Sequence, residues 1–220
     1  MHGLEDETTK QRNLLRDKGD FDGAIAAYTE AICRNPRNAQ SYSGRGQAYR
    51  RKGEWDKAIA DCNQAIQLDP MAAEAYYTRG YSHGRNGDFD KAIADCTEAI
   101  RIDPHEAKAC NVRGMAYGQK GDFDRAIADC TEAIRLDPKF FEAFRVRARL
   151  HDMKGEFDKA IADFTEAIRL NPQYAMAYWG RGHVYEKTSE FDKAIADLTE
   201  SIRLDPRHAE VYSWTGSCLF

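Results

Sequence analysis

Residues 121–138 read GDFDRAIADCTEAIRLDP, and close copies of this stretch recur along the chain. Each copy ends in a proline, and the six prolines of the chain stand 34 residues apart: Pro36, Pro70, Pro104, Pro138, Pro172 and Pro206. Self-similarity at a fixed period of this length is typical of repeat proteins, in which each repeat is one supersecondary unit that stacks on its neighbours. We therefore expect the 220 residues to form a stack of repeats without a single central core.

The repeated stretch has the pattern of an amphipathic helix. Apolar side chains recur in it at three- and four-residue steps: Phe123, Ala126, Ile127, Cys130, Ala133 and Ile134. Gly121 comes where a preceding helix would stop, and Pro138 cannot continue the helix. A second helical stretch precedes each copy, clearest in residues 39–52 and 108–120. Each repeat is therefore predicted to be a helix, a tight turn and an antiparallel helix.

This pattern resembles the tetratricopeptide repeat, whose small, aromatic, alanine and proline positions are filled in the second unit by Tyr42, Gly46, Tyr49, Ala58, Cys62, Ala65 and Pro70. The resemblance implies an all-α fold, a right-handed α-solenoid (superhelix) of antiparallel helix pairs. We expect one array over residues 1–220, with repeats at 5–38, 39–72, 73–106, 107–140, 141–174 and 175–208 and a partial or capping helix at 209–220. The sequence departs from the repeat pattern at Gln11, Arg12, Ala148, Thr188 and Ser189.

Composition and charge exclude several classes of function. The net charge is −4 and 31% of the residues are charged, which describes a soluble surface of mixed sign. A nucleic-acid partner is not expected, because the chain has no basic run. No apolar stretch approaches the roughly 20 residues that span a membrane. The polar start MHGLEDETTKQRN does not resemble a signal peptide, so a cytoplasmic protein without a membrane partner is expected.

The six cysteines do not form a recognisable metal or redox motif, since no Cys-x-x-Cys occurs. Cys62, Cys96 and Cys130 occupy equivalent positions on the apolar stripe, and Tyr28, Phe164 and Leu198 fill this position in the other repeats. We expect buried thiols that act as small hydrophobic side chains, with a redox or metal role as the alternative. No His-Glu-x-x-His, P-loop or Gly-rich dinucleotide motif is present. The sequence therefore predicts no catalytic residues, no metal and no cofactor.

An arginine and an aspartate recur together in the second to sixth repeats. In the second repeat, Arg45 lies eight residues before the turn residue Gly53 and Asp61 lies eight residues after it, so the two are level in an antiparallel hairpin. The equivalent pairs are Arg79 with Asp95, Arg113 with Asp129, Arg147 with Asp163, and Arg181 with Asp197. We predict ion pairs within each repeat that set the register of its helices; the alternative is two independently solvated faces.

The resemblance implies that the first helices of the repeats line a concave groove. The candidate peptide-binding residues are those on the face of each first helix opposite its partner: Gln47, Arg50, Tyr77, Tyr81, Arg85, Lys108, Asn111, Met115, Arg145, Arg149, Trp179 and His183. These positions vary between repeats, whereas the second helices repeat nearly the same exposed residues. Such variation is expected of a face adapted to a ligand, although drift on an unused face would look similar.

Charge on this face suggests the chemistry of a ligand. In the middle four repeats, the cations Arg50, Arg51, Arg85, Lys108, Arg145 and Arg149 outnumber the anions Glu74, Glu142 and Asp152. Arginine and aromatic side chains are also the types that anchor protein interfaces. The sequence therefore predicts a protein or peptide ligand that is acidic and carries an apolar anchor.

The leading hypothesis is a non-enzymatic protein–protein interaction scaffold. One alternative is a self-assembling module, a homo-oligomer formed through the C-terminal segment 209–220, which carries Trp214, Leu219 and Phe220 where a polar cap is usual. Another is the recruiting or regulatory arm of an enzyme whose catalytic domain lies outside this sequence. The same C-terminal segment is also consistent with a piece of a longer array.

Overall fold

A computed structural model describes residues 19–206 of the chain. Within these residues the secondary structure is helical throughout: α2 (Phe21–Arg34), α3 (Ala39–Lys52), α4 (Trp55–Leu68), α5 (Ala73–Arg85), α6 (Phe89–Ile102), α7 (Ala107–Gln119), α8 (Phe123–Leu136), α9 (Phe141–Met153), α10 (Phe157–Leu170), α11 (Ala175–Lys187) and α12 (Phe191–Leu204). The first helix of the first repeat and the partial helix predicted at 209–220 lie outside the described residues. None of the described helices is long and apolar enough to cross a bilayer.

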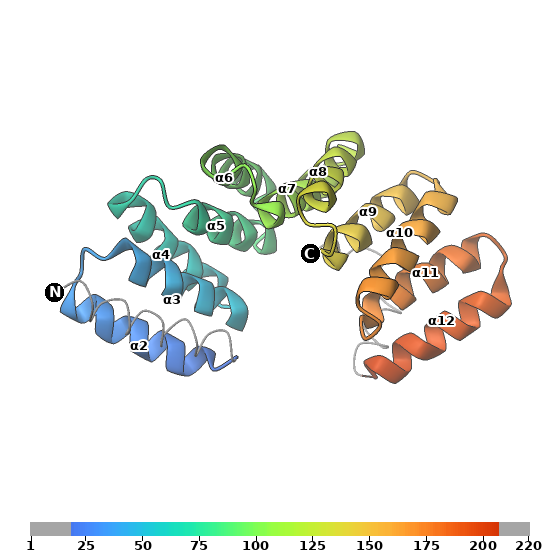
Figure 1. The fold of residues 1–220 in the computed structure, drawn as a ribbon, viewed down its shortest axis with the longest axis horizontal. Helices are drawn as coiled ribbons and strands as arrows, with labels where there is room; N and C mark the ends of the chain where they lie inside the picture. The colour runs from blue at the N-terminus through green and yellow to red at the C-terminus, as the bar shows by residue number, and fades with distance from the viewer. Residues whose placement is uncertain (1–18, 207–220) are drawn as a thin grey trace. The chain divides into compact units, whose positions relative to one another are not determined.

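The helices form two compact units, an N-terminal unit (residues 1–104) and a C-terminal unit (residues 105–220). In the N-terminal unit, α3 pairs with α4 and α5 with α6; in the C-terminal unit, α7 pairs with α8, α9 with α10, and α11 with α12 (Figure 1). Within each unit, the second helix of one hairpin packs on the first helix of the next, as α4 does on α5 and α10 on α11. The predicted all-α fold of antiparallel helix pairs is confirmed.

Backbone geometry at the turns explains why the repeats end where they do. Gly121 adopts a φ of 81°, which L side chains rarely adopt, and Asp122 caps the next helix by accepting a hydrogen bond from the backbone N–H of Arg125 at 3.2 Å. In the last repeat Ser189 takes the same left-handed region with a φ of 61°. The Thr188 hydroxyl closes this turn by donating to the carbonyl of Val184 at 3.2 Å. Although Thr188 and Ser189 depart from the repeat pattern, this turn therefore keeps the left-handed conformation of the other turns.

The core between the helices is built from alanines and thiols. Cys62, Cys96 and Cys130 are fully buried, as predicted. Each faces the small residue of its partner helix: a Cβ on the equivalent glycines Gly46, Gly80 and Gly114 would lie 2.9–3.0 Å from the thiol sulfur. Burial raises the pKa of the Cys62 and Cys130 thiols well above its ordinary value. They pack as small hydrophobic groups, and no cluster of His, Cys, Asp or Glu within residues 19–206 could hold a metal ion.

The predicted Arg–Asp pairs within each repeat are also confirmed. Arg147 donates from Nε and Nη2 to the two carboxylate oxygens of Asp163, both at 2.7 Å, and the other four repeats show the same two-pronged geometry. The structure adds a contact that the sequence did not suggest: Arg147 Nη1 donates to Thr131 Oγ1, in the second helix of the preceding repeat, at 3.1 Å. This arginine therefore ties its own hairpin to the hairpin before it.

Candidate peptide-binding face

The candidate residues lie on what we call the first-helix face, formed by α3 and α5 in the N-terminal unit and by α7, α9 and α11 in the C-terminal unit. In the N-terminal unit they take part in a run of stacked side chains. The guanidinium carbon of Arg50, from α3, lies 5.3 Å from the ring centroid of Tyr77 and 4.9 Å from that of Tyr81, both on α5. Tyr81 in turn lies 5.9 Å from Trp55, and Arg85 lies over the Trp55 ring at 5.2 Å. We call these five side chains the Arg–aromatic stack.

Position in the stack decides how much of each side chain reaches solvent. Tyr77, at the inner end, is 5% exposed. Arg50 and Tyr81 are half-buried, and Arg85 is exposed. Gln47, one helical turn before Arg50 on α3, is half-buried beside them. A cation over an aromatic face contributes about 0.5–2 kcal/mol, depending on how far it is desolvated, so the stack holds Arg50 in a defined place.

In the C-terminal unit, α7 contributes little to an accessible surface. Asn111 and Met115 are both 5% exposed, and Asn111 Oδ1 accepts a weak contact from the thiol of Cys130 at 3.9 Å. Lys108, at the start of the helix, is exposed and has no ion pair among the described residues. Of the three α7 candidates, only Lys108 can meet a ligand without a change in packing.

Asp152 on α9 contacts one cation on α9 and one on α11. Asp152 is buried, and it accepts a hydrogen bond from Lys187 Nζ at 2.6 Å through one oxygen, while its other oxygen lies 3.6 Å from Arg149 Nη1. This arrangement ties α9 to α11 and leaves Arg149 only partly available. Arg145, one turn earlier on α9, is half-buried, and its Nε is buried without a hydrogen-bond acceptor among the described residues.

The aromatic part of the C-terminal unit lies on α11. Trp179 and His183 are half-buried and stack with their ring planes 7° apart and their centroids 5.5 Å apart. Arg149 lies over the Trp179 ring at 6.0 Å. This places an aromatic pair beside the cations of α9, as an interface with an apolar anchor and charged surroundings would require.

The structure thus brings together two subsets of the candidates: Arg50, Tyr77, Tyr81 and Arg85 in the N-terminal unit, and Arg149, Trp179 and His183 in the C-terminal unit. It buries Tyr77, Asn111 and Met115. Sequence reasoning missed Trp55, because it lies on a second helix and only residues of the first helices were taken as candidates. A signal was present: Trp55 stands where the other repeats have phenylalanine, namely Phe21, Phe89, Phe123, Phe157 and Phe191.

Comparison with known proteins agrees with this architecture. Family models described as TPR repeat match residues 13–53 and 46–87, and models described as tetratricopeptide repeat match residues 73–106, 111–175, 154–209 and 179–220. No curated protein matched the sequence.

Several solved structures share the fold. The crystal structure of MamA matches with a TM-score of 0.62 and 25% identity, over 75% of this chain and 96% of that one. YrrB, described as a TPR protein with an unusual peptide-binding site, matches with a TM-score of 0.60 and 24% identity, over 83% of this chain and 94% of that one. The pilF protein of Pseudomonas aeruginosa matches with a TM-score of 0.77 and 15% identity, over 94% of this chain and 96% of that one. At identities of 24% and 15%, the similarities to YrrB and to pilF show a shared fold and nothing more.

Proposed function

Because this chain belongs to the tetratricopeptide repeat family, we propose that it is a non-enzymatic interaction scaffold that binds a peptide or protein segment on its first-helix face. The proposal places it in the cytoplasm as a single array of repeats. YrrB, with the same fold, is described as having a peptide-binding site, which supports the proposal by analogy of fold.

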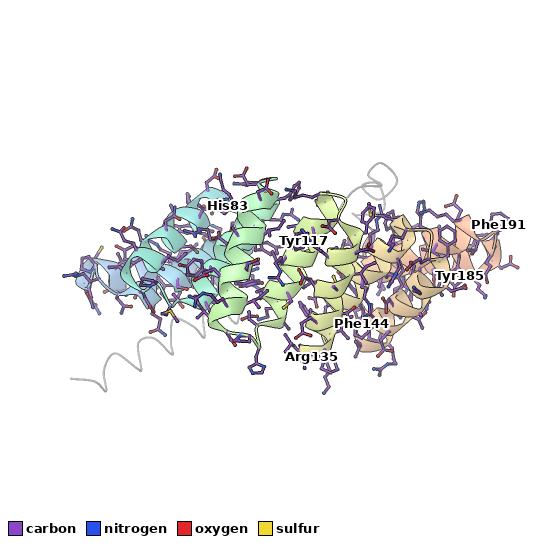
Figure 2. All side chains as sticks on the ribbon, turned by 90° about the horizontal axis from the view of Figure 1, so that it is seen from above. His83, Tyr117, Arg135, Phe144, Tyr185 and Phe191 are labelled. Atoms are coloured by element: carbon purple, nitrogen blue, oxygen red, sulfur yellow. The ribbon has the colours of Figure 1, made fainter. Side chains whose placement is uncertain are left out.

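One contrast between the two faces carries the proposal. On the second helices, exposed arginines are paired with a carboxylate three residues away, as Arg101 is with Glu98 and Arg135 with Glu132, each at 2.6 Å. In Figure 2, Arg135 extends from the edge of the ribbon into solvent. On the first-helix face, by contrast, four of the candidate cations have no carboxylate partner among the described residues: Arg50, Arg85, Lys108 and Arg145. A face that leaves its cations unpaired is suited to an anionic partner.

The aromatic groups supply the second half of this chemistry. Tyr81 and the stacked pair of Trp179 and His183 are half-buried, so each presents an apolar surface beside a cation. The ligand that fits best is an acidic segment with an apolar side chain as its anchor.

Site-directed photo-cross-linking in a cell lysate tests the proposal. A photoreactive phenylalanine at Gln47 or His183 samples the first-helix face, and one at the second-helix positions Lys91 or Lys159, which are exposed, is the matched control. We expect specific adducts from the first-helix positions alone, and direct binding of the identified segment to the purified protein. Arg145→Glu should weaken that binding and Arg135→Glu should not. Equal adducts from both faces, or equal effects of both substitutions, would contradict the proposal.

A second candidate function, self-association, is favoured by one observation on α12. Phe191 and Ile195 are 59% and 65% exposed, whereas the equivalent Phe157 and Ile161 of α10 pack against the core of the C-terminal unit. Figure 2 labels Phe191 on α12, which is the last described helix along the chain. Sedimentation equilibrium tests this candidate: a mass that rises with concentration and falls back to the monomer value in Ile195→Lys would support it.

A further inference from the structure

The cations of the N-terminal unit differ in how their charge is balanced. Most of those described lie within 4.0 Å of a carboxylate: Arg34, Arg45, Lys52, Lys57, Arg79, Lys91 and Arg101. Among the residues described in this unit, Arg37, Arg50, Arg51 and Arg85 have no such partner. Arg50, Arg51 and Arg85 come from the last turns of α3 and α5, so the unbalanced charge is concentrated at one end of the first-helix face.

Arg50 is the most constrained of these groups. Its guanidinium lies over two tyrosine rings, at 4.9 Å from Tyr81 and 5.3 Å from Tyr77, and its Nε is buried without an acceptor among residues 19–206. A buried polar nitrogen without a partner is rare in folded proteins and calls for an explanation. The negative end of the α3 dipole explains why a cation is tolerated there. It does not explain why the guanidinium is stacked on two rings without a hydrogen-bond acceptor.

Stacking leaves a guanidinium well prepared to bind an anion. A guanidinium that lies over aromatic rings keeps its N–H groups in its own plane, where the two terminal nitrogens form a fork that matches the two oxygens of a carboxylate or phosphoryl group. Since the rings already restrict the side chain, little further conformational entropy is lost on binding. Arg85, at the other end of the Arg–aromatic stack, adds a second positive charge over Trp55 at 5.2 Å.

We propose that the Arg–aromatic stack is an oxyanion-binding site, in which Arg50 takes the carboxylate of an aspartate or glutamate, or the phosphoryl group of a phosphorylated residue, in a peptide segment. Tyr77 and Tyr81 position the guanidinium, and Trp55 with Arg85 extends the site toward the turn between α3 and α4. The inference rests on the proposed function, because it names the anchor that the N-terminal unit offers to a bound segment.

A synthetic peptide library tests this site even when the natural partner has not been identified. Random octapeptides containing the common amino acids and phosphoserine are selected on the full chain and on three variants: Arg50→Gln, Arg50→Lys and Arg37→Gln. Arg37 is the matched control, since it is exposed, unpaired among the described residues and in the same unit, but lies before α3 and outside the stack. Circular dichroism melts establish that the variants keep the fold.

We expect the full chain to enrich peptides with aspartate, glutamate or phosphoserine, and the more strongly enriched class identifies the source of the oxyanion. The best peptide should bind about tenfold or more weakly to Arg50→Gln, the size of a charged hydrogen bond, and no more than about twofold more weakly to Arg37→Gln. Arg50→Lys should recover only part of the loss, because it keeps the charge but not the fork.

Three results would overturn the inference: no enrichment of acidic or phosphorylated peptides, equal losses in Arg50→Gln and Arg37→Gln, or full recovery by lysine. The readout also separates this inference from the proposed function. Peptides that bind all three of these variants but do not bind Arg145→Glu would support the scaffold function. They would place the anchor in the C-terminal unit and not at Arg50. Absence of any retained peptide, together with no cross-linked partner, contradicts both.

Discussion

The ring of Phe164 in α10 occupies the space that the missing side chain of Gly180 leaves in α11. Phe164 is 2% exposed, and a Cβ on Gly180 would overlap its ring. Tyr28 and Gly44 repeat this relationship between α2 and α3. Where the apolar position is the smaller Cys130 instead, the residue equivalent to Gly180 is Val146. At these described junctions between consecutive repeats, the sizes of the two positions are therefore complementary.

This relationship predicts a compensating pair of substitutions. Gly180→Val should lower the free energy of unfolding by about 1–3 kcal/mol, because the core has no room for the added methyl groups. Phe164→Cys alone should lower it by about 3–5 kcal/mol through the cavity it leaves. The double variant reproduces the pair formed by Cys130 and Val146, so its loss should be clearly less than the sum of the two. Urea denaturation measures all three; additive losses would contradict size complementarity.

The bidentate pair of Arg147 and Asp163 predicts strong coupling within one hairpin. The two side chains are 19% and 11% exposed, so each is partly desolvated. Removal of either one therefore leaves the charge of the other without a partner in a place that water reaches poorly. A double-mutant cycle with Arg147→Gln and Asp163→Asn should give a coupling free energy of about 1.5–3 kcal/mol. Thr131→Val should lower the free energy of unfolding by less, about 0.5–1.5 kcal/mol, because the hydroxyl that it removes accepts from only one N–H group of Arg147 and otherwise donates to the Ile127 carbonyl of its own helix. Coupling within error of zero would show that the pair is only a solvated contact.

His83 predicts a loss of stability in mild acid. Burial lowers the pKa of its imidazole below the ordinary value of 6.5, despite Asp88 and Asp95 at 3.6 and 3.9 Å. The unfolded chain therefore binds a proton at His83 at a higher pH than the folded protein does. The contribution of neutral His83 is complete above pH 6.5 and is lost as the pH falls from there through the lower pKa of the folded state.

The matched variant for His83 is His83→Tyr, since tyrosine fills the equivalent position at Tyr117 (both labelled in Figure 2). Urea midpoints measured from about pH 5 to 8 should fall less toward acid in this variant than in the parent. The other histidines remain in both proteins, so the difference isolates His83. Parallel pH profiles would rule out the assigned role.

The thiols predict a sharp difference in reactivity. Cys33 is exposed, whereas burial raises the pKa of Cys110 to about 11 and that of Cys62 and Cys130 further. In a Cys218→Ser background, which removes the one thiol outside the described residues, a disulfide reagent at about pH 8 should modify one thiol rapidly in the native protein. Adding Cys33→Ser should abolish this fast phase, and urea should expose the remaining thiols. Rapid reaction of the double variant without urea would contradict the described burial.

The sequence by itself determined the helices, the hairpins and the Arg–Asp pairs. These features depend on contacts at short and regular separations along the chain: an apolar stripe at three- and four-residue steps, a glycine such as Gly121 that permits a left-handed turn, and two residues placed equally far from that turn. Each feature is local to one repeat, and the same pattern of residues recurs every 34 residues, so several repeats support each prediction independently.

Only the tertiary structure decided which candidate residues meet and which are covered. Contact between the first helices of consecutive repeats, such as α3 with α5, buries Tyr77 and sets Arg50 against its ring. Trp55 joins them from α4, a second helix, whereas the candidates from the sequence all lay on first helices. Such contacts depend on side-chain rotamers and on the distance between neighbouring helices, and neither is encoded by the spacing of residues within one repeat.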